Sequence, residues 1–499
     1  MSIAILASRA QLGIEAPPVT IEVFLSGGLP RFNVVGMPGT AVRESSDRVR
    51  GAIINSGLPF PRERITVSLA PADMRKSGGR FDLAIALGIL SAQKAIPATA
   101  LDNTEFLGEL SLNGDLRPVP GVLPAALRAR DAGHALIVPS ENVDEAALAH
   151  CRVYPVATLL DVIAHLRGVR TIEAAPAIMP APGKAQGPGL EDVRGQSRAK
   201  RALEIAAAGG HNLLLIGPPG TGKSMLARRL PGILPPMTDR EALEVAGIDS
   251  VLGNRIELSR WRLRPFRAPH HTASAPAVVG GGPGPRPGEI SRAHNGVLFL
   301  DELPEFSRHV LEVLREPLEA GVITISRAAR QADFPARVQL VAAMNPCPCG
   351  YLGDTQGNCH CSRDRVASYR GKISGPLLDR IDLRVEVGRL PRDALRDAAA
   401  GGERSETVRE RVVAARMLAL ARSGVCNTEL EGEQLEAVSR QGKEGLRLLD
   451  DAVERFGLSA RAYHRVLRVS RTIADLAAAD RVGAAHVAEA LSLRALEQR

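Results

Sequence analysis

The chain has 499 residues, of which 45% are hydrophobic and 24% charged, so it has enough apolar material for several cores and predicts about three domains. Its net charge of +8 is modest for this length, and charge alone does not distinguish a nucleic-acid-binding surface from a solvated one. No apolar run reaches the ~20 residues of a membrane helix, no signal peptide is evident, and four of the six cysteines cluster rather than forming a disulfide framework, so we expect a cytoplasmic protein without membrane contact.

The first 170 residues are predicted to form one unit of mixed strands and helices. Alternating apolar and polar residues predict strands at Thr20–Leu25 and Arg64–Leu69. Helical periodicity favours helices at Phe81–Leu90 and Pro120–Arg130. We therefore assign residues 1–170 to an N-terminal α+β domain.

Two further units follow a linker. Residues 171–190 are rich in Pro, Ala and Gly and lack apolar periodicity, which is typical of a linker. Residues 191–390 contain short apolar strands that run into glycines and helices, which predicts an α/β domain with a parallel sheet. Residues 391–499 are predicted to be almost wholly helical, with the longest helices at Ser405–Ala421 and Ala460–Ala479.

A phosphate-binding loop lies in the second unit. Residues 217–224 have the sequence GPPGTGKS, which matches G-x-x-x-x-G-K-[ST], and they follow a predicted strand at Asn212–Ile216. The glycines allow backbone N–H groups to approach phosphate oxygens, and the next helix directs its positive end toward them. Lys223 is expected to reach the β- and γ-phosphates of ATP, and the Ser224 hydroxyl to bind Mg²⁺. The predicted nucleotide-binding residues are Gly217, Pro218, Pro219, Gly220, Thr221, Gly222, Lys223 and Ser224.

An acidic motif follows about eighty residues later. The sequence VLFLDE at Val297–Glu302 predicts a buried strand that ends in two carboxylates at the carboxyl edge of the sheet, where ligands bind in open α/β folds. Asp301 is suited to hold Mg²⁺, directly or through water, and Glu302 to polarise the attacking water. After a phosphate-binding loop, this motif predicts an ATP hydrolase that uses Mg²⁺.

The order of these motifs resembles that of the AAA+ ATPases, and among them the magnesium-chelatase-like branch that includes the ComM/YifB family. Glu191–Gln196 (EDVRGQ) resembles the segment before the first AAA+ helix, which usually frames adenine, and Gly288–Glu302 resembles this branch's approach to its acidic motif. Val341–Asn345 (VAAMN) is similar to the sensor-1 strand, so Asn345 would hydrogen-bond the γ-phosphate or the water; from the residues alone it could instead cap a turn before Pro346. The resemblance implies an AAA+ core followed by a helical lid.

The resemblance also implies two arginines that act on nucleotide. The sequence SGPLLDRID around Arg380 looks like the arginine-finger segment, so Arg380 would reach the nucleotide of a neighbouring subunit; the alternative is a surface ion pair. The sequence LSAR that ends at Arg461 resembles sensor 2, which contacts phosphate in its own or a neighbouring subunit. Arg465 and Arg468 lie on adjoining turns, so either could take this role instead. A finger that acts between subunits implies a homo-oligomeric ring, by resemblance a hexamer.

Four cysteines form a compact pattern in the second unit. Two C-x-C pairs lie in the loop 347–361, and the Gly- and Asp-rich residues between them allow the loop to fold back on itself. Four thiolates at this spacing predict a closed tetrahedral site for structural Zn²⁺, with His360 as an alternative ligand; a metal-free loop with reduced cysteines is the other interpretation. The resemblance to the ComM/YifB family includes this four-cysteine loop, which the photosynthetic chelatase subunit does not share. The predicted ligands are Cys347, Cys349, Cys359 and Cys361.

The N-terminal unit resembles a different family. Ala70–Leu90 and Gly114–Ala126 are similar to the ribosomal S5 domain 2-like fold that is found in the protease domain of Lon and in the C-terminal domain of RadA. Lon-type proteolysis needs a Ser nucleophile and a Lys base, but residues 95–183 contain no Lys, and the adjacent Lys76–Ser77 pair lies in a loop where a dyad rarely forms. We therefore expect a pseudo-protease domain that serves ring assembly or DNA contact.

Two insertions are placed to contact a substrate. The segment 255–292 contains seven arginines and two glutamates, and it includes the sequence RPFRAPHHT at Arg264–Thr272. A second insertion, Gly321–Arg337, predicts a hairpin with Arg327 and Arg330 near its tip, where they would suit contacts with DNA phosphates. In this AAA+ branch such insertions resemble hairpins that line the pore of a ring. The histidines of the first insertion are equally well explained by packing or by subunit contacts.

Together these features predict a ring-forming, ATP-dependent motor. By resemblance to the ComM/YifB family, it is expected to be a DNA helicase that promotes branch migration of recombination intermediates during natural transformation, acting on single-stranded or branched DNA. The first alternative is a magnesium-chelatase-like motor that remodels a protein partner. The presence of Glu302, Asn345 and Arg380 disfavours a scaffold that uses ATP only as a switch, and the missing lysine disfavours an ATP-dependent protease.

Overall fold

The computed structural model describes residues 2–183, 187–282, 285–327, 330–354, 359–390 and 402–494. The side chains of Arg327 and Arg330, which are predicted to contact DNA, lie outside this description. The side chain of Phe456 and residues 355–358 of the cysteine loop also lie outside it. The chain divides into two compact units, Met1–Ala181 with Leu243–Ser259, and Pro182–Ala242 with Arg260–Arg499. None of the described helices is long and apolar enough to cross a membrane.

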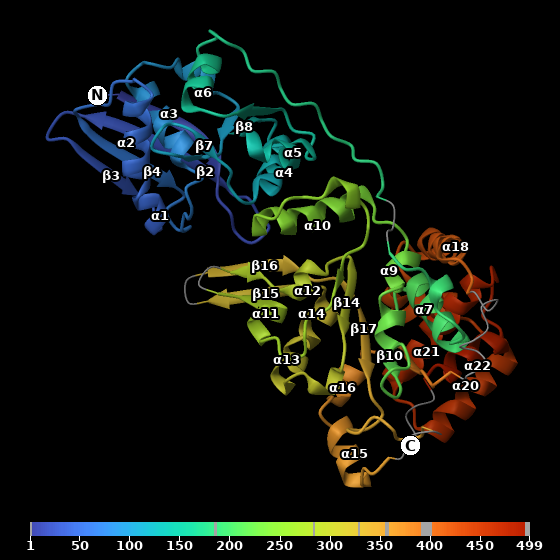
Figure 1. Cartoon of the computed structure of the whole chain (residues 1–499). Coiled ribbons are helices and arrows are strands. Elements are labelled where there is room, and N and C mark those ends of the chain that lie inside the picture. Colours follow the sequence, from blue (N-terminus) through green and yellow to red (C-terminus); the bar gives the residue numbers. More distant parts are fainter. Residues whose placement is uncertain are drawn as a thin grey trace. The chain divides into compact units, whose positions relative to one another are not determined.

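The N-terminal unit is built on one mixed sheet of seven strands in the order β3-β4-β2-β1-β5-β8-β9 (Figure 1). β1 pairs antiparallel with β2, whereas β5, β8 and β9 continue the sheet in parallel. The strands predicted at Thr20–Leu25 and Arg64–Leu69 are confirmed as parts of β2 and β4. The strands of this unit are β1 (Ser2–Arg9), β2 (Pro18–Ser26), β3 (Arg31–Val35), β4 (Arg64–Ala70), β5 (Thr104–Phe106), β6 (Glu109–Leu110), β7 (Leu116–Arg117), β8 (Ala135–Pro139) and β9 (Val153–Val156).

Helix α3 (Asp82–Ala92) is buried along its whole length and packs on β1 and β2, because its sequence is apolar on every side. The helix predicted at Phe81–Leu90 is therefore confirmed. The helix predicted at Pro120–Arg130 is also present, but it begins at Val122, after Gly121 adopts a left-handed φ of 73°. The helices of this unit are α1 (Thr40–Arg43), α2 (Ser45–Asn55), α3, α4 (Val122–Asp131), α5 (Val143–Ala147) and α6 (Leu159–Leu166), with most of α10 (Asp239–Leu252).

The second unit contains a five-stranded parallel sheet in the order β11-β14-β17-β10-β18. The strands predicted before the phosphate-binding loop and in the acidic motif are confirmed as β10 and β14. Because parallel strands end at the same edge, the residues that follow β10, β14 and β17 gather at the carboxyl edge, and those that precede β18 lie at the opposite, amino edge. The strands are β10 (Leu213–Ile216), β11 (Phe266–Arg267), β14 (Gly296–Leu300), β17 (Val338–Met344) and β18 (Leu383–Glu386).

Two short antiparallel pairs interrupt this α/β pattern. β15 (Val322–Arg327) and β16 (Arg330–Pro335) form a hairpin, which confirms the hairpin predicted at Gly321–Arg337 (Figure 1). β12 (Gly280–Gly281) pairs with β13 (Arg286–Pro287). The helices of the α/β part are α7 (Ser197–Gly209), α8 (Lys223–Ala227), α9 (Leu230–Ile233), α11 (Ala275–Val279), α12 (Glu289–Arg292), α13 (Arg308–Val313), α14 (Arg315–Ala320), α15 (Arg363–Arg370) and α16 (Gly375–Leu378).

The described chain from residue 402 onward is helical, as predicted. Helices α18 and α21 pack against α7 beside the sheet (Figure 1), and apolar residues of both parts share one core. The helices are α18 (Ser405–Ser423), α19 (Gly432–Val438), α20 (Lys443–Phe456), α21 (Ala460–Leu476) and α22 (Ala484–Ser492). Residues 391–401, where the predicted core meets the predicted lid, lie outside the described chain. The parallel sheet and the helical C-terminal part fit a magnesium-chelatase-like AAA+ fold.

Candidate active site

The phosphate-binding loop joins β10 to α8 at the carboxyl edge of the sheet. Gly217 passes so close to the chain after β18 that a Cβ atom there would lie 2.1 Å from the carbonyl oxygen of Val387. Gly222 has a φ of 89° immediately before α8, a left-handed conformation that favours glycine. Both glycines are therefore required by the path of the loop, which leads into the start of α8 as the predicted phosphate-binding loop requires.

Lys223 is buried beneath this loop. Its Nζ donates to the carbonyl oxygen of Gly217 at 2.7 Å and to Asn345 Oδ1 at 3.2 Å. Burial lowers the pKa of Lys223, and the charges of Asp301 and Glu302 oppose that shift. The structure thus brings the loop lysine, the predicted sensor-1 asparagine and both acidic residues into one site. The side chain of Asn345 thus accepts a hydrogen bond from the loop lysine.

The predicted magnesium ligands are in direct contact. Ser224 Oγ donates to Asp301 Oδ2 at 2.6 Å. Neighbouring ligands of octahedral Mg²⁺ lie about 3 Å apart when its bonds are about 2.1 Å long, so one ion fits between this hydroxyl and this carboxylate after a small shift. The backbone N–H of Glu302 donates to Asp301 Oδ1 at 3.0 Å, and Glu302 Oε2 lies 3.3 Å from Nδ1 of His271. The contact with His271 was not predicted from the sequence.

Two polar side chains, those of Gln196 and Tyr369, hydrogen-bond the backbone of segments that form the site. Gln196 Nε2, in the segment before α7, donates to the carbonyl oxygen of Gly388 at 2.8 Å and to that of Thr221 at 3.4 Å, so it links the loop to the chain after β18. Tyr369 of α15 hydrogen-bonds the backbone of Asn345, and burial together with the charge of Glu305 raises the pKa of Tyr369 to about 12. The phenol is therefore neutral and can keep this hydrogen bond at neutral pH.

The four cysteines of the loop 347–361 converge on one point. All four Sγ atoms lie within 4.8 Å of one another, and the separations are 3.3 Å for Cys347–Cys349, 3.7 Å for Cys347–Cys359 and 3.6 Å for Cys349–Cys359. A tetrahedron with Zn–S bonds of about 2.3 Å has edges of about 3.8 Å. The described residues therefore fit a structural Zn²⁺ held by Cys347, Cys349, Cys359 and Cys361, which would leave no position open for a reacting ligand.

The cysteine loop also packs against the nucleotide site. A Cβ atom on Gly350 would lie 2.7 Å from Cδ of Pro219, so the two loops are in close contact. Arg389, which follows β18, pairs with Asp354 at 2.9 Å. The cysteine loop and the phosphate-binding loop therefore lie directly against each other at Gly350 and Pro219.

We expect a Cys359→Ser variant to lose bound zinc and to melt at least about 5 °C below the wild-type protein, because a structural metal contributes directly to folding. Metal content and thermal melting measure both effects. The control is Cys426→Ser, since Cys426 lies outside the cluster and accepts a hydrogen bond from Arg416 that a hydroxyl can also accept. Unchanged zinc and unchanged melting temperature in Cys359→Ser would contradict a structural metal.

The predicted arginine finger lies at the amino edge of the sheet, two residues before Asp382. Arg380 pairs with Glu319 of α14 and donates to the carbonyl oxygen of Pro376 at 2.8 Å. The four residues of β10, at about 3.3 Å each, separate this edge from the phosphate-binding loop by about 13 Å. Arg380 and the phosphate-binding loop of its own chain therefore face opposite edges.

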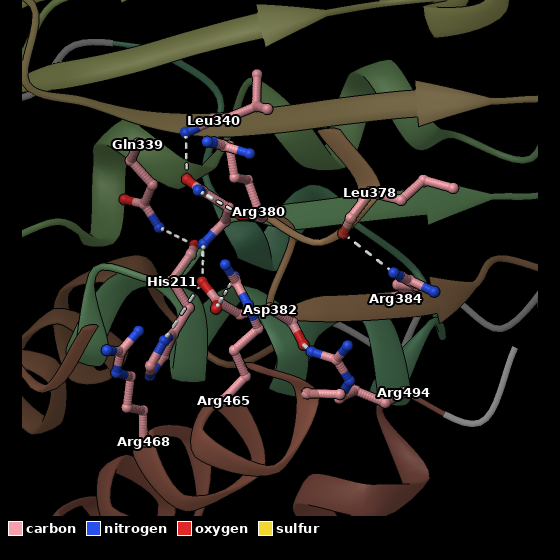
Figure 2. Close-up of polar contacts among 12 residues, drawn as sticks. His211, Gln339, Leu340, Leu378, Arg380, Asp382, Arg384, Arg465, Arg468 and Arg494 are labelled. Atoms are coloured by element: carbon pink, nitrogen blue, oxygen red, sulfur yellow. Dashed lines mark hydrogen bonds and ion pairs between the residues drawn. The ribbon is translucent and has the colours of Figure 1, made fainter. Parts of the chain in front are cut away.

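A buried network holds the segment that carries Arg380 (Figure 2). Asp382 accepts from Arg465 Nη1 at 2.6 Å and from the backbone N–H of Asn212 at 2.9 Å. Burial alone would raise the pKa of Asp382, but the nearby His211 ring and the Arg465 guanidinium hold that pKa well below its usual range. Asn212 Nδ2 donates to the carbonyl oxygen of Arg380 at 2.8 Å. The network therefore joins the predicted finger segment, the start of β10 and helix α21 of the C-terminal part.

Arg461 lines the same cavity as Arg380, which has a volume of about 680 Å³ and lies at the amino edge of the sheet. Arg461 is exposed and forms no hydrogen bond or ion pair within the described part of the chain. By contrast, Arg465 is held by Asp382, and Arg468 Nε donates to the carbonyl oxygen of Leu430 at 2.7 Å. Of these three arginines, Arg461 has the guanidinium that is open to an incoming phosphate.

Part of the arginine-rich stretch is neutralised by local carboxylates. Arg267 makes two hydrogen bonds to Glu289, at 2.7 and 3.0 Å, and Arg292 pairs with the same carboxylate at 2.6 Å. Arg264 pairs with Glu241 at 3.2 Å. The charge counted along the sequence therefore overstates the basic surface that this stretch presents.

The adjacent residues Lys76 and Ser77 of the N-terminal unit do not form a Ser–Lys dyad. Lys76 is buried, and its Nζ donates to the carbonyl oxygen of Pro71. Ser77 is exposed, and the described side chains of these two residues do not hydrogen-bond each other.

Three family models match the chain. The model described as magnesium chelatase, subunit ChlI, matches residues 189–395. A model of subunit ChlI of Mg-chelatase matches residues 21–142, and one of the ChlI C-terminal region matches residues 402–494. These matches cover both compact units.

Individual relatives cover almost the whole chain. It is 50% identical over 501 residues to "Competence protein ComM" of Haemophilus influenzae, which includes 99% of this chain and 98% of that protein. It is 47% identical over 500 residues to "Uncharacterized protein YifB" of Escherichia coli, across 100% of this chain and 98% of that protein. Similarity to the "Magnesium-chelatase 38 kDa subunit" of Cereibacter sphaeroides is lower, 26% over 221 residues, which are 40% of this chain and 58% of that protein. The chain belongs to the magnesium-chelatase-like ComM/YifB family.

Proposed function

We propose that the protein hydrolyses ATP with Mg²⁺ at the site between the phosphate-binding loop and the acidic motif. The single observation that carries this proposal is the convergence of Lys223, Ser224 and Asp301 with Asn345 and Glu302 at one edge of the sheet. Lys223 binds the β- and γ-phosphates, Ser224 and Asp301 hold the ion that balances their charge, and Asn345 orients the γ-phosphate or the water. Glu302 accepts the proton of the attacking water.

We further propose that each site is completed by a neighbouring subunit. Arg380 and Arg461 share a cavity at the edge opposite the phosphate-binding loop, which supports a role on the nucleotide of the next subunit. A head-to-tail contact of this kind generates a closed ring when its rotation closes. By family resemblance the ring is a homo-hexamer.

The motor proposed here acts on DNA in the cytoplasm. Membership of the ComM/YifB family and the printed name of the Haemophilus influenzae relative, a competence protein, support a helicase that promotes branch migration during natural transformation. The hairpin β15–β16, with Arg327 and Arg330 at its end, is the proposed contact with single-stranded or branched DNA. In this scheme, residues 1–170 form an S5 domain 2-like pseudo-protease domain, 171–190 a linker, 191–390 the AAA+ core and 391–499 the lid.

We expect single-stranded and branched DNA to stimulate ATP hydrolysis several-fold, and the stimulation to fade as salt rises from 50 to about 200 mM, because phosphate contacts release counterions. The measurement is steady-state ATP turnover by purified protein with and without each DNA across a salt series. Basal turnover that no DNA stimulates at any salt concentration would contradict a DNA motor.

A second function is favoured by the matches to magnesium-chelatase subunits. In this alternative the same ATPase remodels a protein partner, and basal turnover would respond to that partner rather than to DNA. The local pairing of arginines in the first insertion is compatible with this alternative, since it reduces the basic surface available to DNA.

A further inference from the structure

The side chain of His271 touches the residue to which we assign water activation. Its Nδ1 lies 3.3 Å from Glu302 Oε2, and the two side chains are 31% and 53% exposed. The sequence alone predicts a substrate contact, local packing or a subunit contact for the RPFRAPHHT segment that contains His271. The contact with Glu302 gives it a different role.

The fold explains why these two residues meet. β11 pairs in parallel with β14, with Phe266 opposite Val297, so the residues after both strands emerge at the same edge of the sheet. After β11 the chain turns, and the carbonyl oxygen of His270 accepts from the backbone N–H of Ala273 at 2.9 Å. His271 is the second residue of this turn. It lies next to the end of β14, the strand that Glu302 follows.

The His271 ring is held in its orientation from two sides. The ring of Phe306, which is buried, meets it edge-on with centroids 6.5 Å apart, and the ring of His270 lies 4.1 Å away at an interplanar angle of 32°. Strand β11 is itself fixed, since Arg267 makes two hydrogen bonds to Glu289. The imidazole therefore presents Nδ1 to Glu302 from a supported position.

The main chain of Glu302 is restrained, so it is mainly the orientation of the carboxylate that can vary. Glu302 has a left-handed φ of 53°, which is uncommon for a residue other than glycine, and its N–H donates to Asp301 Oδ1 at 3.0 Å. A carboxylate has two oxygens, and a general base needs one of them aimed at the water with a free lone pair. A donor on one oxygen fixes where the other points.

We propose that His271 is a positioning residue for ATP hydrolysis, donating from Nδ1–H to Glu302 Oε2 so that Oε1 is the oxygen that accepts the proton of the attacking water. An imidazole carries a proton on Nδ1 in its cationic form and in its Nδ1–H neutral tautomer, and these are the two forms that can donate to Glu302 Oε2. The inference rests on the proposed ATP hydrolysis and adds a residue to it. It also gives the first insertion a part in catalysis through its position in the fold.

The test compares steady-state ATP turnover of four proteins: wild type, His271→Ala, His271→Asn and His309→Ala. We expect His271→Ala to lower kcat about 10-fold or more with KM for ATP within about 2-fold, because orientation contributes part of the 10²–10⁴-fold that a general base supplies. His271→Asn keeps an N–H donor near the position of Nδ1 and is expected to recover most of kcat. His309→Ala removes an exposed histidine of α13 for which the described chain shows no contact with His271 or Glu302, and it is expected to retain wild-type turnover.

Two further results separate a positioning role from a structural one. In the Glu302→Gln background, adding His271→Ala is expected to leave the residual single-turnover rate unchanged, because His271 acts through the carboxylate that is already absent. An additional 10-fold loss in the double variant, or kcat at or above the wild-type value in His271→Ala, would overturn the assignment. Thermal melting of His271→Ala and His271→Asn identifies loss of folding.

The same series distinguishes failure of this inference from failure of the proposed function. If Glu302→Gln is inactive while His271→Ala turns over ATP at the wild-type rate, only the role of His271 is overturned. If the wild-type protein does not hydrolyse ATP, or Glu302→Gln does so normally, the proposed function fails and the role of His271 fails with it.

Discussion

Replacing Glu302 by Gln is expected to lower ATP turnover by about 10²–10⁴-fold while ATP binding stays within about 2-fold of the wild-type value. Gln has nearly the same size and shape as Glu but cannot accept the proton of the attacking water. The groups that bind phosphate and Mg²⁺, namely Lys223, Ser224 and Asp301, are unchanged, so the bound state is preserved. Steady-state turnover and titration with a fluorescent ATP analogue measure the two quantities.

The matched control is Glu305→Gln, which removes a carboxylate from the turn that follows Glu302. Glu305 lies 3.5 Å from Lys372, and both side chains are about half exposed, so the pair contributes little to stability. Its turnover is expected to stay close to the wild-type value. Normal turnover in Glu302→Gln would remove the assignment of water activation to Glu302.

Replacing Arg380 by Ala is expected to lower turnover by about 10³-fold or more, the effect of losing an arginine finger. Here the guanidinium pairs with Glu319, whose side chain is 67% exposed. An ion pair that is open to solvent on one side contributes only about 0–1 kcal/mol, so Arg380 can exchange it for a phosphate. Arg365→Ala, an exposed arginine of α15, is the control for the loss of one positive charge.

Mixing two inactive variants tests whether the finger acts between subunits. Lys223→Ala subunits have a defective phosphate-binding loop and an intact Arg380, whereas Arg380→Ala subunits have the reverse. In a mixed ring, an Arg380→Ala subunit has an intact phosphate-binding loop, and a Lys223→Ala neighbour supplies an intact Arg380. The site between these two subunits therefore contains both parts. We expect mixtures to exceed the turnover of either variant alone. Mixtures that stay as inactive as their components, although size measurements show mixed rings, would contradict a shared site.

Local sequence patterns were sufficient to predict the parts of the site that are formed by a single loop or strand. The glycines of Gly217–Ser224 and the run of apolar residues before Asp301 determine a loop and a strand by their own conformational preferences. The order of strands in the sheet then brings these loops to one edge. Most elements predicted from periodicity, such as α3 and the hairpin β15–β16, are present for the same reason.

The supporting residues could not be predicted because their partners are distant in sequence. His271 meets Glu302 only because β11 lies beside β14, and Asp382 meets Arg465 only because the fold brings α21 to the segment that precedes β18. No periodicity in either segment encodes these pairings. Charge counting failed for a similar reason, since Glu241, which neutralises Arg264, lies outside the basic stretch.

Branch migration of a four-way DNA junction is the measurement that tests the proposed motor most directly. A labelled junction is incubated with purified protein and ATP, and the conversion of junction to duplex products is followed. We expect conversion by the wild-type protein with ATP, and none with Glu302→Gln or with a non-hydrolysable ATP analogue. Wild-type protein that hydrolyses ATP at its full rate in the presence of the junction but converts none of it would contradict a branch-migrating DNA motor.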